Sequence, residues 1–282
     1  MQELDRYIDK IKKLPPAPKI IPELLHLLRQ SDIDAGKIVR LITVDIGLTS
    51  SVLALANSAQ FGGLTPAATL HEAVTRLGFQ QVFRLVITIT GSRALGPAQE
   101  GYGLNTGELW KHSVSTAVAA QLIASETGDD PNLAFTAGLL HDLGKIVLSE
   151  GLANKAPELF SAEAHDGISQ IDLEKKLLGV QHGEIGGRLL QRWRFPESLV
   201  NAVWYHHQPA GARPHQRLAA LVFLGNIVAY SIGHGYGHNA FAIRARSEVF
   251  EILGTTPEIM STTIMKTFDN LQMVEGLFGA AA

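Results

Sequence analysis

The stretch AGLLHDLGK, Ala137 to Lys145, places a histidine and an aspartate side by side in an apolar run and follows them with a glycine and a lysine. Charged side chains are rare in apolar segments unless a partner compensates for their burial. Three kinds of partner could compensate for the burial of His141 and Asp142: a metal ion, a reacting substrate, or neighbouring side chains. The order of the other histidines along the chain bears on this choice.

The composition limits the class of protein. The chain has 282 residues, 46% of them hydrophobic, which is enough for one large domain or two ordinary ones. A net charge of −3 offers no basic field for nucleic acid or anionic lipid. The absence of cysteine excludes disulfides, thiolate zinc sites and cysteine nucleophiles. The charged start does not resemble a signal peptide, and the longest apolar run, 218–230, is too short to span a bilayer. We expect a cytoplasmic protein with no membrane contact, for which nucleic acid is a disfavoured partner.

Apolar residues recur at spacings of three and four through most of the chain, which predicts an all-α fold. The segment 85–90 alternates like a strand, but we expect a helix because a single strand would have no partner. Helix starts are predicted at Asp130-Pro131 and Pro196. The glycine-rich segment GPAQEGYGLNTG predicts a boundary. The expected organisation is two packed helical lobes, 1–95 and 108–282, joined by a linker at 96–107.

Histidines and carboxylates stand on separate predicted helices of the second lobe. Glu108 and His112 are spaced i, i+4 and so share one helix face. Donor atoms brought together from several helices form a metal site inside a bundle. The candidate ligands are Glu108, His112, His141, Asp142, His182, His206 and His207. This mixture suits iron, manganese or zinc better than magnesium or calcium, and seven ligands suggest two ions.

Each candidate also has a simpler interpretation. The histidines and Asp142 could form a buried polar network held by mutual hydrogen bonds without a metal. Glu108 could be a surface residue. Lys145 could face a substrate phosphate, pair with Asp142 or lie in solvent. The remaining histidines are expected at the surface or, in the first lobe, at the lobe interface: His26, His71, His165, His215, His234 and His238.

The ordered set resembles the HD superfamily of metal-dependent phosphohydrolases, with a spacing closest to its HD-GYP branch. The first lobe resembles the HDOD domain, a bacterial signalling relative, in LPPAPKIIPELLHLL (14–28), IVRLITVDIGLTSSVLALANSAQFG (38–62) and TLHEAVTRLGFQQVFRLV (69–86). The resemblance runs from about residue 14 to about residue 230. It implies that the second lobe is an HD-like helical bundle, and that Asn226 stands where the HD pattern has an aspartate ligand. No Gly-Tyr-Pro follows His207, so cyclic di-guanylate hydrolysis is not implied.

Three functions remain open. The first, which we favour, is a regulatory output module of bacterial signalling with a metal site, preferably iron or manganese and dinuclear, and a protein partner. Such a module could also bind a phosphorylated small molecule or form a homodimer, and both alternatives stay open. The second is a metal-dependent phosphohydrolase in which Asp142 and Lys145 would be catalytic, acting on a phosphate ester or nucleotide. The third and least favoured is a diiron redox or oxygen sensor.

Overall fold

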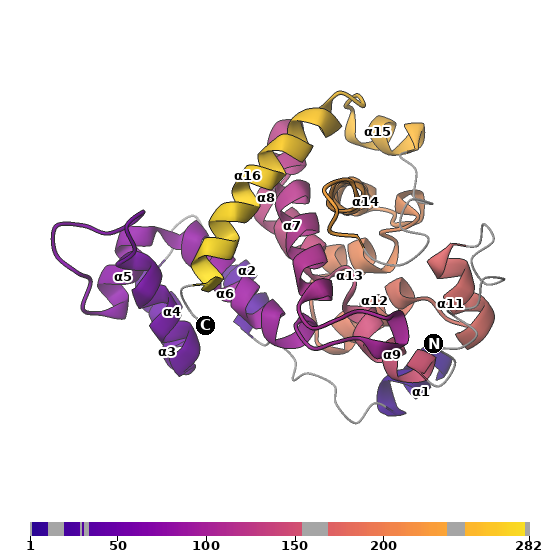
Figure 1. Cartoon of the computed structure of the whole chain (residues 1–282), viewed down its shortest axis with the longest axis horizontal. Coiled ribbons are helices and arrows are strands. Elements are labelled where there is room, and N and C mark those ends of the chain that lie inside the picture. Colours follow the sequence, from indigo (N-terminus) through magenta and orange to yellow (C-terminus); the bar gives the residue numbers. More distant parts are fainter. Residues whose placement is uncertain are drawn as a thin grey trace. The chain divides into compact units, whose positions relative to one another are not determined.

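The computed structural model describes residues 2–10, 20–28, 30, 34–153, 169–235 and 246–279. Every regular element among these residues is a helix, and the only strand-like pairing in them is an isolated bridge between Gln99 and Leu104. The predicted all-α fold is therefore confirmed (Figure 1). The alternating segment 85–90 lies inside helix α6, Phe79–Leu95.

The chain divides into two compact units. Unit 1 comprises residues 1–16 and 91–271, and unit 2 comprises 17–90 and 272–282. The sequence placed the change of lobe within 96–107, whereas the structural division falls inside α6. The N-terminal helix α1, Gln2–Lys10, belongs to unit 1.

Unit 2 is built from short helices: α2 (Ile20–Leu28), α3 (Ala35–Thr43), α4 (Ile46–Ala56), α5 (Leu70–Leu77) and the first part of α6. Helices α3, α4 and α5 contact one another. Helix α4 ends at Ala56, and Asn57 is its C-cap. The Asn57 side chain accepts from the Ala67 main-chain N–H at 2.7 Å and donates to the Ala67 carbonyl at 3.0 Å. Asn57 thus closes the loop that joins α4 to α5.

Besides α1, unit 1 holds most of the described helices. In chain order they are α7 (Glu108–Thr127), α8 (Pro131–Leu140), α9 (Leu143–Ala153), α11 (Gln170–Leu178), α12 (His182–Arg192), α13 (Glu197–Trp204), α14 (Gln216–Ser231), α15 (Ser247–Leu253) and α16 (Ile259–Gly279), the last of which continues beyond the unit. Among the described residues of this unit, the short 3₁₀ helices η1 (Glu100–Tyr102) and η3 (Pro209–Gly211) lie in the connections. The predicted starts are confirmed, with Asp130 as the N-cap of α8 and Pro196 as that of α13.

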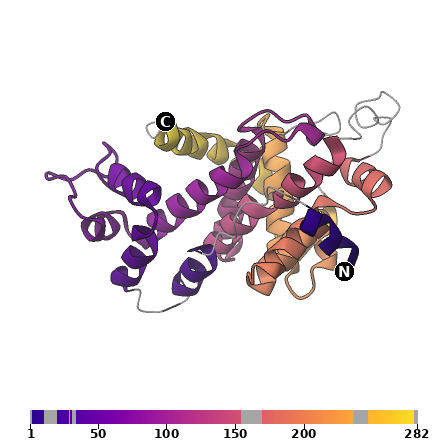
Figure 2. The ribbon, with the colours of Figure 1, turned by 90° about the horizontal axis from the view of Figure 1, so that it is seen from below.

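Helix α7 is central to unit 1 because it contacts both α8 and α14 (Figure 1, Figure 2). Small residues permit this close packing. A Cβ on Gly138 of α8 would lie 2.7 Å from the Ala117 Cα of α7, so only glycine fits at position 138. Ala117, Ala120 and Ala124 of α7 are fully buried. The backbones of these helices therefore approach closely, and polar side chains at their ends can meet.

Candidate metal centre

The junction between α8 and α9 carries the HD pair. His141 is the C-cap of α8, and Asp142 immediately precedes α9. A Cβ on Gly144 would clash with the His182 carbonyl oxygen, so glycine at this position lets α9 lie directly against the start of α12. The HDLG sequence thus brings the HD pair and His182 to one place.

The first group of candidate ligands comprises His112, His141 and Asp142, all of them buried. His112 Nε2 lies 3.5 Å from Asp142 Oδ2, and His141 Nε2 lies 3.4 Å from the same oxygen. His112 comes from the second turn of α7, so helix α7 and the α8–α9 junction supply this group.

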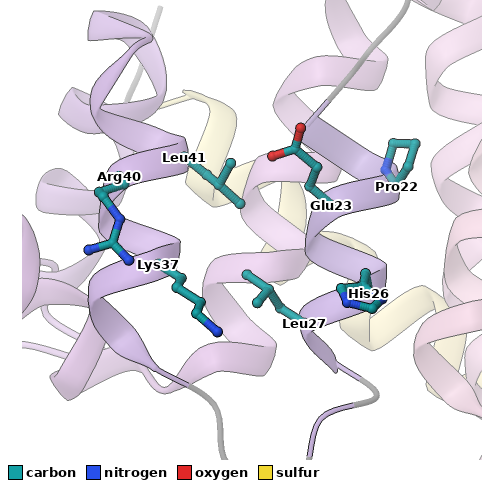
Figure 3. A pocket seen from close by; sticks show the side chains of 7 residues that line it. All are labelled: Pro22, Glu23, His26, Leu27, Lys37, Arg40 and Leu41. Atoms are coloured by element: carbon teal, nitrogen blue, oxygen red, sulfur yellow. The ribbon is translucent and has the colours of Figure 1, made fainter.

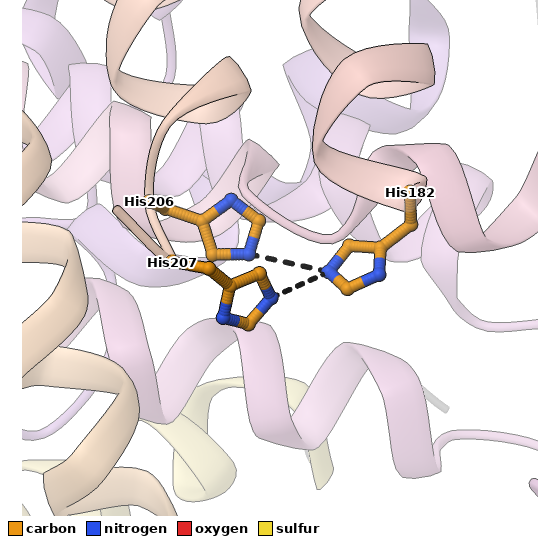
Figure 4. A group of neighbouring side chains, drawn as sticks. All are labelled: His182, His206 and His207. Carbon is orange, nitrogen blue, oxygen red and sulfur yellow. Dashed lines mark hydrogen bonds between the residues drawn. The ribbon is translucent and has the colours of Figure 1, made fainter. Parts of the chain in front are cut away.

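The second group comprises His182 at the start of α12 and the pair His206-His207 just after α13 (Figure 4). The Nε2 atoms of His206 and His207 lie 3.2 and 2.9 Å from the Nε2 atom of His182. Two nitrogens that bind one ion at about 2.1 Å and at a right angle are about 3 Å apart. The spacing of the three rings therefore matches that of ligands sharing one ion.

Asp142 connects the two groups through its two oxygens. While Oδ2 faces the first group, Oδ1 lies 3.2 Å from His182 Nε2 and 4.0 Å from His206 Nε2. A carboxylate in this position can bridge two cations. The structure thus brings together all five predicted histidine ligands and Asp142.

Main-chain carbonyls fix the orientation of three rings. The Nδ1 atom of each ring donates a hydrogen bond of 2.7 Å to a carbonyl oxygen. His112 donates to His234, His141 to Gly138 and His206 to Val203. Since a carbonyl oxygen only accepts, the hydrogen of each neutral ring is on Nδ1, and Nε2 presents its lone pair towards the centre. This is the form in which histidine binds a metal, with its second nitrogen held by an outer partner.

Burial keeps most of these rings neutral. It lowers the pKa of His112 to about 3, lowers that of His141, and holds the pKa values of His206 and His207 well below the ordinary range. Burial also acts against a charged His182, but Glu174 and Asp142 outweigh it and raise the pKa of His182 to about 9. In the metal-free chain a charged His182 supplies the hydrogen for its contacts with the neighbouring rings.

The donor set fits a transition-metal cation. His141 Nε2 is buried and has no hydrogen-bond partner within the described part of the chain, although it faces Asp142. Burial alone would raise the pKa of Asp142, but His141, Lys145 and His182 hold it well below its usual range, so the group is an anion. Several nitrogen lone pairs thus surround one buried negative charge, an arrangement that a cation completes.

Lys145 is bound within the cluster. Its Nζ donates to Asp142 Oδ2 at 2.7 Å, and Asp142 raises the pKa of the amine although burial opposes the charge. This contact agrees with the interpretation in which Lys145 pairs with Asp142. Beside it lies a cavity of about 10 Å³, lined by Tyr102, Leu104, Leu109, His112, Lys145, Gln170 and Tyr230. That volume is at the lower limit for a single water molecule.

Asn226 and Glu108 differ in their surroundings. Asn226 is buried on α14, and its Oδ1 atom has no hydrogen-bond partner among the described residues. Tyr230, one turn further on, has its ring centroid 5.1 Å from that of His112. Glu108, in contrast, accepts hydrogen bonds from the main-chain N–H and the side-chain amide of Asn105, at 2.8 and 3.2 Å. It belongs to neither ligand group. Both residues remain predicted ligands, and of the two only Asn226 has a buried side-chain atom without a hydrogen-bond partner among the described residues.

Two features of the site were missed from the sequence. Glu174 of α11 is fully buried and contacts His182, as described below. His234 was expected at the surface, but it is half-buried. Its carbonyl accepts a hydrogen bond from His112, and its ring Nδ1 lies 2.6 Å from Ser115 Oγ. His165 and His238 lie outside the described residues.

A wider cavity of about 460 Å³ lies in unit 2 between α2 and α3 (Figure 3). Leu27 and Leu41 line it together with the charged Glu23 and Lys37. None of the predicted ligands lines this cavity, so it is separate from the metal centre.

The fold and the buried cluster define a class of protein: an all-helical protein with a histidine–aspartate centre of the kind predicted from the HD pair. The family model described as the HDOD domain matches residues 14–209. The chain belongs to the HDOD family.

Curated relatives extend beyond this chain. An uncharacterised protein of Treponema pallidum is 29% identical over 222 residues, which are 78% of this chain and 42% of the relative. Ribonuclease Y of Opitutus terrae is 31% identical over 159 residues, 56% of this chain and 24% of the relative. The chain thus spans less than half the length of these relatives.

Solved structures show the same fold. An HDOD domain protein of unknown function from Geobacter sulfurreducens has a TM-score of 0.70 at 24% identity, covering 99% of this chain and 96% of its own. A protein from Shewanella amazonensis, described as a proposed phosphohydrolase, has a TM-score of 0.69 at 27% identity, covering 95% and 93%. Among the described residues of this chain, no helix combines the length and apolar character needed to cross a membrane.

Proposed function

We propose that the chain is a regulatory module of bacterial signalling whose unit 1 binds a divalent transition metal. The observation that supports a regulatory role over catalysis is the enclosure of the cluster. Asp142 and four of the histidines are almost completely buried, and the adjoining cavity holds at most a single water. A phosphate ester has no room beside the ligands in this arrangement.

The metal would join separate elements of unit 1. His112 comes from α7, His141 and Asp142 from the α8–α9 junction, and His182 from the start of α12. A bound ion would offset the charge of Asp142 and link these helices, so occupancy would change their packing. The mixed set of imidazole and carboxylate donors suits iron or manganese, and the bridging position of Asp142 suits two ions. A change in packing is a signal that a protein partner of the module could detect.

The second candidate function is metal-dependent phosphohydrolysis. It is supported by the likeness to the proposed phosphohydrolase from Shewanella amazonensis and by the match to ribonuclease Y. In such an enzyme the metal would lower the pKa of a bound water. Asp142 would hold the metal and Lys145 would offset the phosphate charge. This function requires the residues that enclose the small cavity to move apart, so that a phosphate ester can reach the ligands.

Elemental analysis of freshly purified protein tests the proposal. We expect one to two iron or manganese ions per chain, lost in a His141→Ala, Asp142→Ala double variant and retained in His71→Ala, which removes an exposed histidine of unit 2. No stoichiometric metal in the unaltered protein would contradict the proposal. The metal-loaded protein is then assayed against phosphate esters, phosphodiesters and nucleotides. Turnover lost with the double variant would favour the phosphohydrolase, and an oxygen-dependent spectrum would favour the redox sensor.

A further inference from the structure

Glu174 contacts both the main-chain N–H and the ring of His182. Its carboxylate oxygens both lie 2.8 Å from His182 Nδ1, and Oε2 accepts the main-chain N–H of His182 at 2.7 Å. Glu174 is fully buried and comes from α11, while His182 is the first residue of α12. The same carboxylate therefore accepts the main-chain N–H of His182, which has no partner within its helix, and also orients the His182 ring.

This contact sets which nitrogen of His182 faces the centre. An ionised carboxylate only accepts, so the hydrogen of a neutral His182 lies on Nδ1 and its Nε2 lone pair points to His206, His207 and Asp142. We propose that Glu174 is a positioning residue of the metal centre, which holds the His182 ring in its metal-binding tautomer and orientation. This inference rests on the proposed metal-binding function.

Tyr102 connects Glu174 to a second segment. The Tyr102 hydroxyl donates to Glu174 Oε1 at 2.9 Å, and its ring centroid lies 5.8 Å from the Nζ atom of Lys145. Tyr102 belongs to η1, in the segment predicted as a linker, and it lines the small cavity. The hydroxyl thus holds the carboxylate that in turn holds His182. Removal of this hydroxyl should affect the metal centre less than a change of Glu174, because Glu174 keeps its contacts with His182.

The test compares Mn²⁺ affinity in full-length variants by competition with a chelator. Replacing an outer-shell partner of a metal-bound histidine weakens metal binding about 10- to 100-fold. We expect a loss of this size in Glu174→Gln, because the amide keeps the size of the side chain but loses its charge and presents donor hydrogens where His182 and Tyr102 also donate. Tyr102→Phe should lose less. The matched control is Glu184→Gln, since Glu184 accepts the main-chain N–H of Gln181 at 2.8 Å at the same helix start without contacting a candidate ligand.

A double-mutant cycle separates positioning from general support of the fold. If Glu174 acts through His182, then Glu174→Gln has no further effect on Mn²⁺ affinity in a His182→Ala background. An equal loss in both backgrounds, or an affinity unchanged in Glu174→Gln, would overturn the inference. Circular dichroism and thermal unfolding identify any variant that fails to fold.

A metal-independent measurement keeps the two proposals distinct. Nitrogen-15 spectra of the imidazole rings, recorded above pH 9 where His182 of the metal-free protein is neutral, report which of its two nitrogens carries the hydrogen. We expect Nδ1 in the unaltered metal-free protein and a mixture of both tautomers in Glu174→Gln. If the unaltered protein binds no Mn²⁺ but shows this tautomer, the proposed function fails and the role of Glu174 in orienting the ring stands. A neutral His182 with its hydrogen on Nε2 would overturn the inference even if the protein binds metal.

Discussion

Lys145 Nζ donates a hydrogen bond to Asp142 Oδ2 at 2.7 Å, and both side chains are buried at the centre of the histidine cluster. Asp142 is thus neutralised by Lys145 on one side and faces histidine nitrogens on the other. The balance between these partners determines how the unit responds to loss of the amine, to pH and to metal.

Replacing Lys145 with methionine should destabilise the metal-free protein by about 3–5 kcal/mol, because the change removes one of the two cations, Lys145 and His182, that compensate for the buried charge of Asp142. A metal ion at Asp142 supplies that missing charge. Added Mn²⁺ should therefore raise the free energy of unfolding more in Lys145→Met than in the unaltered chain. Chemical denaturation with and without Mn²⁺ measures both effects.

The control for that substitution is Lys175→Met. Lys175 is exposed and lies 3.5 Å from Glu184, a surface ion pair that contributes at most about 1 kcal/mol. If Lys145→Met costs no more than this control, Lys145 does not compensate for the buried charge of Asp142.

The metal-free protein should be most stable near pH 6.5, the ordinary pKa of histidine in an unfolded chain. The raised pKa of His182, about 9, gives stability that is fully present below pH 6.5 and lost as the pH rises through about 9. The lowered pKa of His112, about 3, has the opposite consequence, because the unfolded chain takes up a proton below pH 6.5 that the folded chain refuses. Thermal unfolding in a chelator between pH 5 and 9 should show a decline on both sides.

His182→Gln should remove the alkaline decline, and His71→Ala should leave it in place. Bound metal should also reduce the decline, because the metal takes the neutral form of His182. A melting temperature that stays constant from pH 6.5 to 9 in the metal-free, unaltered protein would show that His182 is not charged in the fold.

Replacing two glycines of α9 with alanine should change the free energy of unfolding in opposite directions. A Cβ at Gly144 meets the His182 carbonyl oxygen and lies 2.8 Å from the Gly186 main-chain nitrogen, so Gly144→Ala forces α9 and α12 apart. We expect it to cost at least about 1–3 kcal/mol and to weaken metal binding. A Cβ at Gly151 meets nothing nearer than 3.8 Å, so Gly151→Ala should stabilise α9 by about 0.5–1 kcal/mol.

Urea unfolding and Mn²⁺ affinity are measured on both variants. Equal stabilities for Gly144→Ala and Gly151→Ala would contradict the close approach of α9 to α12.

The sequence predicted the helical fold and the residues whose donor atoms meet, because both follow from local patterns. Helical periodicity identified the helices, and His112, His141 and His182 each stood on a separate one. Glu108 illustrates the limit of spacing as a guide. It shares a face with His112, but at the first turn of α7 its carboxylate finds hydrogen-bond donors in Asn105.

Glu174 and His234 could not be identified because their roles depend on tertiary structure. Glu174 is followed by Lys175 and Lys176 and resembles a solvated helix residue, yet the chain turns so that it meets His182, eight residues later. His234 acts mainly through its main-chain carbonyl, which every residue possesses and no sequence pattern marks. The change of unit inside α6 is equally hidden, because the helix continues through it without a break.

The most direct test of the metal centre is an anomalous difference map from crystals of the protein supplied with Mn²⁺ or Fe²⁺, collected at the edge of that metal. We expect a peak within bonding distance of the Nε2 atoms of His182, His206 and His207, and a second peak near His112, His141 and Asp142. A well-ordered cluster with neither peak, its rings joined only by hydrogen bonds, would contradict the presence of a metal centre in unit 1.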